Sequence, residues 1–199
     1  MEPFTRLTAT ALPIARANVD TDQIVPARYL QKPRSDDFGA YLFRDLRFRA
    51  DGGENPDFPL NDPAYRAARI VVAERNFGCG SSREHAVWAL YDHGFRAAIA
   101  PSFGDIFASN ALKNGFLPVR LGEPIVAGLL EQLAASKGAA VTVDLAAQTV
   151  YAPDGSAHRF EIDGFAKRCL LEGLDEIGYT LTLLDKVALF EARQSRDQT

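Results

Sequence analysis

Residues 69–85 read Arg-Ile-Val-Val-Ala-Glu-Arg-Asn-Phe-Gly-Cys-Gly-Ser-Ser-Arg-Glu-His and carry the strongest structural signal in the chain. The first five residues form a short apolar run rich in β-branched side chains, which predicts a buried strand. A glycine loop follows at 76–82, and the apolar spacing from about Arg83 to His93 predicts a helix that ends at Gly94. This order favours a parallel sheet whose ligand-binding loops follow the carboxyl ends of the strands.

The same alternation continues downstream of this stretch. A second short strand is predicted at 97–100, a helix at 102–114 and a third strand at 117–119. The side chains expected on the buried face of the helix are Phe103, Ile106, Phe107 and Leu112. Alternating strands and helices imply a parallel sheet with helices packed against it.

The flanking segments predict a smaller antiparallel β element beside the parallel layer. The elements expected there are a strand at 5–15, a helix at 123–136, a hairpin at 141–145 and 149–152, a strand at 159–162 and two helical stretches within 165–193. Residues 50–65 hold three prolines and two glycines and are expected to form a surface excursion. Together these patterns predict one mixed α/β domain over residues 1–199.

Composition limits the class of protein. A chain of 199 residues with 47% hydrophobic and 24% charged residues can bury roughly 70% of its surface and needs no disulfides for a core. The net charge of −4 argues against non-specific nucleic-acid binding. With no apolar stretch of about 20 residues and no signal-peptide pattern, we expect a cytoplasmic protein. Two cysteines and three histidines argue against a metal or iron–sulfur site within this chain.

The glycine loop Gly78-Cys79-Gly80-Ser81-Ser82-Arg83 allows two interpretations. Ser81 followed by Glu84 is a capping-box pattern, so the serine could serve only to cap the helix. Alternatively, a helix N-terminus, two glycines and Arg83 together suit a carboxylate or phosphate ligand. The loop matches neither the dinucleotide-binding, the phosphate-loop nor the hydrolase-elbow pattern. A second polar stretch, Asn18–Pro26, is typical of an Asx-rich turn and lacks the spacing of an EF-hand.

Four segments taken together resemble one known family. Asp20–Pro26, Asn76–Ala86, Pro101–Phe107 and Asn110–Pro118 occur in the order found in the small subunits of 3-isopropylmalate dehydratase, and the resemblance covers roughly residues 4–190. These subunits correspond to the swivelling domain of the aconitase superfamily. The resemblance implies a swivelling β/β/α fold with a parallel sheet flanked by helices.

The resemblance also implies an activity and a partner. The expected reaction interconverts 2-isopropylmalate and 3-isopropylmalate through 2-isopropylmaleate, by dehydration and rehydration, in leucine biosynthesis. A separate large subunit is expected to carry a [4Fe–4S] cluster and to form a heterodimer or larger assembly with this chain. This chain itself is expected to bind no metal and to be an active hydro-lyase only with that partner.

By the same resemblance, individual residues receive roles. Ser81 is expected to be the catalytic base, acting as an alkoxide. The residues expected to bind substrate are Gly80, Ser82, Arg83, Asp22 and Arg34. Cys79 is expected to pack in the interior, and His85 to form a hydrogen bond at the start of the helix.

Two alternatives to this assignment stay open. The segment Arg34-Ser35-Asp36-Asp37-Phe38-Gly39 departs from the family pattern where the substrate side chain would be sensed. A related hydro-lyase, acting on homoaconitate or on methylmalate and citraconate, is therefore the nearest alternative. A non-catalytic carboxylate-binding module is the alternative from a different functional class.

Overall fold

The computed structural model describes residues 1–34, 38–188 and 190, and its central feature is one seven-stranded mixed sheet. The strands lie in the order β4-β3-β2-β1-β5-β6-β7. Their bounds are β1 Arg6–Ile14, β2 Ile70–Ala73, β3 Ala97–Ala100, β4 Leu117–Arg120, β5 Ala140–Asp144, β6 Thr149–Tyr151 and β7 Ala157–Arg159. The pairs from β4 to β1 are parallel, and those from β1 to β7 are antiparallel. The expected combination of a parallel layer and a smaller antiparallel element is confirmed.

Strand β1 joins the two halves of the sheet. Its first part, Arg6–Thr10, pairs with β5, and its second part, Ala11–Ile14, pairs with β2. Pro13 is tolerated in the second part because no ladder with β5 runs alongside it, so one edge lacks a partner. Pro118 fits β4 for the same reason, since β4 is the edge strand of the parallel half.

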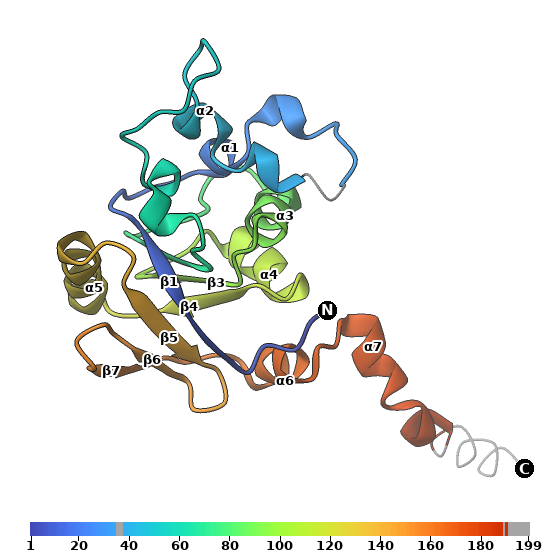
Figure 1. The fold of residues 1–199 in the computed structure, drawn as a ribbon. Helices are drawn as coiled ribbons and strands as arrows, with labels where there is room; N and C mark the ends of the chain where they lie inside the picture. Colours follow the sequence, from blue (N-terminus) through green and yellow to red (C-terminus); the bar gives the residue numbers. More distant parts are fainter. Residues whose placement is uncertain (35–37, 189, 191–199) are drawn as a thin grey trace, which may run out of the picture.

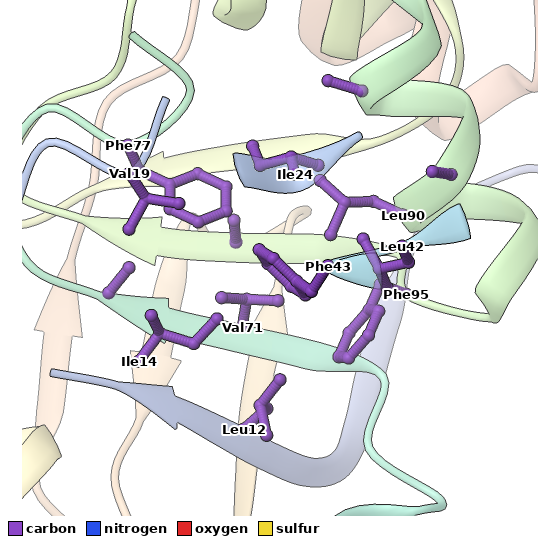
Figure 2. Packing of buried hydrophobic residues seen from close by; sticks show 14 of the residues in the cluster. Leu12, Ile14, Val19, Ile24, Leu42, Phe43, Val71, Phe77, Leu90 and Phe95 are labelled. Carbon is purple, nitrogen blue, oxygen red and sulfur yellow. The ribbon is translucent and has the colours of Figure 1, made fainter. Parts of the chain in front are cut away.

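Helices cover both faces of the sheet and make three layers (Figure 1). One face carries α3 Glu84–His93 and α4 Asp105–Lys113, and the other carries α5 Glu123–Ala135 and α6 Gly164–Glu172. The buried residues of β1, β2 and β3 alternate between the two apolar clusters, as the period of two requires: Val71 belongs to the first, Ile70 and Val72 to the second. Figure 2 shows Val71 with Leu12 and Ile14 pointing into the first cluster.

The segment between β1 and β2 closes the first cluster on the side away from the sheet. It contains the one-turn helices α1 Thr21–Ile24 and α2 Arg44–Arg47, and the short 3-10 turns η1 Ala27–Tyr29, η2 Phe38–Tyr41, η3 Pro59–Asn61 and η4 Pro63–Tyr65. Ile24, Leu42 and Phe43 from this segment meet Leu90 of α3 in the cluster (Figure 2). The cluster therefore ties the polar loops above the sheet to the sheet itself.

Three details differ from the sequence expectation. Only the first half of the predicted excursion at 50–65 is exposed, because Phe58, Leu60 and Tyr65 insert into the first cluster. The last strand lies at Ala157–Arg159 rather than 159–162, where it pairs with β6. In α4, Ile106 is 51% exposed, because Phe107 and Ala111 form the buried stripe of that helix.

The C-terminal region is described as far as residue 190, apart from residue 189, so the rest of the predicted helical range 165–193 lies outside the described residues. Helix α6 packs Leu170 into the second cluster, and α7 Glu176–Leu181 leads away from the sheet (Figure 1). Within the part of the chain described here, no helix combines the length and the apolar character needed to cross a membrane.

Gly78 is a point where the fold depends on the absence of a side chain. Its backbone has φ +71°, and an added Cβ would lie 2.3 Å from the ring of Phe107. Gly104 approaches from the neighbouring loop so closely that its own Cβ would lie 2.4 Å from the Gly78 carbonyl oxygen. The loop after β2 can therefore rest on α4 only with glycine at both positions.

We predict that Gly78→Ala lowers the free energy of unfolding by about 2 kcal/mol or more, because it adds a clash in the core to a left-handed backbone. The matched control is Gly128→Ala in α5, where an added Cβ meets nothing within 4 Å. That change should stabilise the chain by about 0.5–1 kcal/mol, since alanine favours helix. Urea unfolding of both variants measures the difference, and equal effects would contradict the packing argument.

Candidate active site

The site forms where the parallel strands end. The chain leaving β1 and the chain leaving β2 stay paired beyond the strands: Ile14 pairs with Ala73, and Asp20 still pairs with Cys79, so the register is unchanged. The loop after β3 joins on the other side through a bridge between Phe77 and Phe103. The sheet thus extends as a three-segment platform that carries the glycine loop, as expected for ligand loops in such sheets.

Two asparagines join the segments after β1 and β2 at the start of this platform. Asn18 and Asn76 both have left-handed backbones, with φ of 56° and 62°, a conformation that asparagine tolerates better than most residues. The Asn76 side-chain amide donates to the Asn18 side-chain oxygen over 2.8 Å. Asparagine is a recognisable turn signal, but the contact between these two side chains joins segments fifty-eight positions apart, which no local pattern predicts.

The polar stretch at 18–26 is more ordered than the expected turn. Asp20 caps the one-turn helix α1 by accepting from the Gln23 backbone N–H at 2.7 Å. Thr21, the first residue of α1, is buried beneath the glycine loop. Asp22 follows it and projects toward Arg83. The stretch therefore supplies Thr21 beneath the glycine loop and Asp22 beside Arg83.

Ser81 and Ser82 are exposed at the top of the loop, just before α3. Helix α3 begins at Glu84 with Arg83 in the N-cap position, and no side chain caps it. The capping-box interpretation is therefore wrong, because the helix begins too late for Ser81 to occupy the cap. Both serine side chains face solvent beside the free N–H groups of the first turn of α3, a setting that favours negative charge.

Arg83 is the cation of the site. Its side chain is only 15% exposed and forms an ion pair with Asp22, whose side chain is 52% exposed. The two residues come from segments sixty-one positions apart, which only the paired chains beyond β1 and β2 bring together. A partly buried guanidinium of fixed orientation can offer its planar donors to a second carboxylate.

Arg34 lies apart from this group. Its guanidinium donates to both Asp92 carboxylate oxygens, at 3.0 and 2.7 Å, and lies 5.3 Å from the Trp88 ring. The hydrogen bond to Asp92 raises the pKa of Arg34. Because Asp92 is nine residues along α3 from Arg83, the two ends are separated by about 13 Å. The structure therefore brings Gly80, Ser81, Ser82, Arg83 and Asp22 together, and leaves Arg34 at the far end of the helix.

Cys79 and His85 lie beside this group of residues. Burial, with the nearby Asp20 carboxylate, raises the pKa of the Cys79 thiol and so disfavours the thiolate. The His85 side chain forms no hydrogen bond within the described residues, and its ring packs 4.6 Å from Trp88 and 5.9 Å from Phe38. The expected hydrogen bond of His85 at the helix start is therefore wrong.

The described part of the chain contains no set of side chains that could bind a metal ion or cluster. No three His, Cys, Asp or Glu side chains gather there in a way that could hold an ion. Cys79 lies in the loop after β2, whereas Cys169 is buried in α6 on the other face of the sheet. These residues do not fit an iron–sulfur cluster, which takes three or four ligands.

The geometry thus combines an exposed hydroxyl, a helix N-terminus and a paired arginine. Comparisons with known proteins agree on one family. The profile of the aconitase C-terminal domain matches residues 1–124, and one described as LeuD_N matches residues 127–164. The 3-isopropylmalate dehydratase small subunit of Paramagnetospirillum magneticum is 53% identical over 191 residues, which are 96% of this chain and 95% of that protein. That of Rhodospirillum centenum is 52% identical over 198 residues, 100% of this chain and 98% of that protein.

A solved structure supports the same grouping. The crystal structure of 3-isopropylmalate dehydratase from Methanocaldococcus jannaschii is similar with a TM-score of 0.66 at 25% identity, over 95% of this chain and 99% of that chain. The resemblance seen in the sequence motifs is confirmed over nearly the full length. This chain belongs to the family of 3-isopropylmalate dehydratase small subunits, within the aconitase superfamily.

Proposed function

We propose that this chain is the small subunit of a 3-isopropylmalate dehydratase and supplies the proton-transfer side of its active site, with residues 1–199 acting as one domain. The observation that carries the proposal is the exposed Ser81 hydroxyl beside the Arg83–Asp22 pair at the end of β2. The full-length similarity to proteins of that name supports the substrate and the reaction.

Dehydration of an isopropylmalate removes a proton from a carbon next to a carboxylate and expels hydroxide from the neighbouring carbon. Ser81 accepts that proton in the dehydration direction and returns it in the hydration direction. A serine hydroxyl gives up its own proton reluctantly, so its alkoxide needs nearby positive charge. The N-terminus of α3 and the Arg83 guanidinium lie where they can provide that charge.

Substrate carboxylates bind to the same loop. Arg83 offers planar donors, Ser82 a hydroxyl, and Gly80 a backbone that a ligand can approach closely. Asp22 holds Arg83 in place before the substrate arrives. Arg34 remains a proposed second substrate arginine, and in that role its guanidinium has to exchange Asp92 for a substrate carboxylate.

In this proposal, the group that assists the departure of hydroxide is supplied by a partner subunit. We assign the [4Fe–4S] cluster to a large subunit, because the described residues of this chain do not form a ligand set for it. The exposure of Gly80, Ser81 and Ser82 fits a site that is completed by a second chain.

We predict that Ser81→Ala lowers kcat of the complex with the large subunit by at least about 10²-fold, as expected for the loss of a general base. The matched control is Ser136→Ala, which truncates an exposed serine in the turn after α5 and should leave kcat unchanged. Steady-state assays with 2-isopropylmalate, homoaconitate and citraconate test the base and the substrate class together. A Ser81→Ala complex with normal kcat would remove the catalytic assignment.

We predict that Arg83→Lys raises KM at least about tenfold and also lowers kcat, because lysine keeps the charge but loses the planar two-pronged grip. Arg28→Lys is the matched control, since Arg28 also pairs with an aspartate, Asp45, on an exposed surface. The control should change neither constant by more than about twofold, given the small energies of exposed ion pairs. Equal kinetics for the two variants would contradict the role of Arg83.

We predict that Arg34→Ala raises KM by about tenfold or more if Arg34 reaches the substrate, a loss typical of a charged hydrogen bond. If its role is only to hold Asp92 and Trp88, the same change lowers thermal stability and leaves KM intact. Measuring KM and melting temperature on one preparation separates these outcomes. An unchanged KM withdraws Arg34 from the substrate site.

A further inference from the structure

We infer that Thr21 is a positioning residue for the reaction. It fixes the Cys79–Gly80 and Ser81–Ser82 peptide groups so that their two backbone N–H groups face the reacting serine. The inference rests on the proposed function of Ser81. Thr21 acts through the loop backbone and is not assigned contact with substrate.

The buried position of Thr21 is unusual for a polar side chain in this fold. It is 2% exposed, and in the described part of the chain only Asn61 joins it among buried polar or charged residues. Its hydroxyl donates to the Ser81 carbonyl oxygen over 2.9 Å, and its backbone N–H donates to the Cys79 carbonyl oxygen, also over 2.9 Å. One threonine therefore binds the carbonyl oxygens of both neighbours of Gly80, Cys79 and Ser81.

Little else holds this part of the loop. Within the described residues, the hydrogen bond from Thr21 to the Ser81 carbonyl is the only one made by residues 80–82. Gly80 is favoured here by its backbone φ of +89°, which L side chains rarely adopt, although an added Cβ would lie at ordinary contact distances, 3.6 Å from the Thr21 hydroxyl oxygen and 3.4 Å from the Asp20 Cβ. The orientation of the exposed Ser81 backbone thus depends on a single buried hydroxyl.

The consequence follows from the planarity of the peptide bond. In a trans peptide the C=O and the following N–H point in opposite directions. Because the Cys79 and Ser81 carbonyls point inward to Thr21, the N–H groups of Gly80 and Ser82 point away from it, toward the exposed face of the loop. Two aligned N–H donors on one short segment stabilise negative charge on an adjacent oxygen. In the proposed reaction that charge develops on Ser81 or is carried by a substrate carboxylate.

The test removes the hydroxyl and keeps the shape. In the complex with the large subunit, Thr21→Val should lower kcat at least about tenfold while KM changes by less than about threefold, as for loss of alignment in the transition state. Thr21→Ser keeps the hydroxyl and should restore kcat to within about threefold of the unmodified protein. The matched control is Thr10→Val, which removes a threonine hydroxyl bonded to the Gly138 carbonyl in β1, far from the loop, and should leave kcat unchanged.

A purely structural role gives a different pattern. It predicts that Thr21→Val lowers the melting temperature with kcat intact, and that outcome overturns the inference. If Thr21→Val does not fold, Thr21→Ser is compared with Thr21→Ala, because these two differ by the hydroxyl alone. A serine variant no more active than the alanine variant overturns the inference as well.

A spectroscopic readout separates this inference from the proposed function. In the isolated full-length chain, the carbonyl ¹³C resonance of Ser81 should move in Thr21→Val and return in Thr21→Ser. An unmoved resonance overturns the inference whatever the activity. A complex of the unmodified protein that does not dehydrate isopropylmalate contradicts the proposed function instead, and an active complex whose kcat survives Thr21→Val contradicts only the role of Thr21.

Discussion

The parallel pairing of β1 with β2 is the interaction on which the rest of the molecule depends. It continues past the strands in unchanged register to Asp20 and Cys79, so two segments distant in sequence leave the sheet as one platform. Three contacts join these same two segments: the Arg83–Asp22 ion pair, the hydrogen bond from Thr21 to the Ser81 carbonyl, and the hydrogen bond between the two asparagine side chains. A slip of one residue between β1 and β2 would separate every one of them. The register that buries Leu12 and Val71 therefore also assembles the site.

The elements and site residues that could be predicted from the sequence are those marked by short, local patterns of residues. The β-branched run at 70–73 and the apolar stripe of 84–93 identify β2 and α3 because burial imposes a period on neighbouring residues. The motif resemblance identified Ser81, Arg83 and Asp22, which the fold brings together. Local signals also misled: Ser81 and Glu84 have the spacing of a capping box, yet Thr21 binds the Ser81 carbonyl and the helix begins only after Arg83.

The features that escaped prediction depend on long-range contacts. The pairing of Arg34 with Asp92 joins residues fifty-eight positions apart, and no local pattern announces it. Phe58 and Tyr65 stand among prolines and turn formers, which predict a loop, while their rings fill space left above the sheet by other elements. The buried Thr21 is similarly inconspicuous between two aspartates, because its importance arises only from the carbonyls that the β2 loop presents to it.

The Arg83–Asp22 pair also determines how a charged ligand meets this chain. Opposite charges in contact cancel at a distance, so the paired arginine adds little to the electric field beyond about one Debye length, roughly 8 Å in physiological salt. With a net charge of −4, the chain as a whole repels a dicarboxylate weakly. In the proposed function, binding of a carboxylate here is a short-range exchange, in which the ligand displaces or joins Asp22 as an acceptor for Arg83. In the proposed complex this subunit therefore adds little attraction for a dicarboxylate from a distance, and the weak repulsion from its net charge falls further as salt is added.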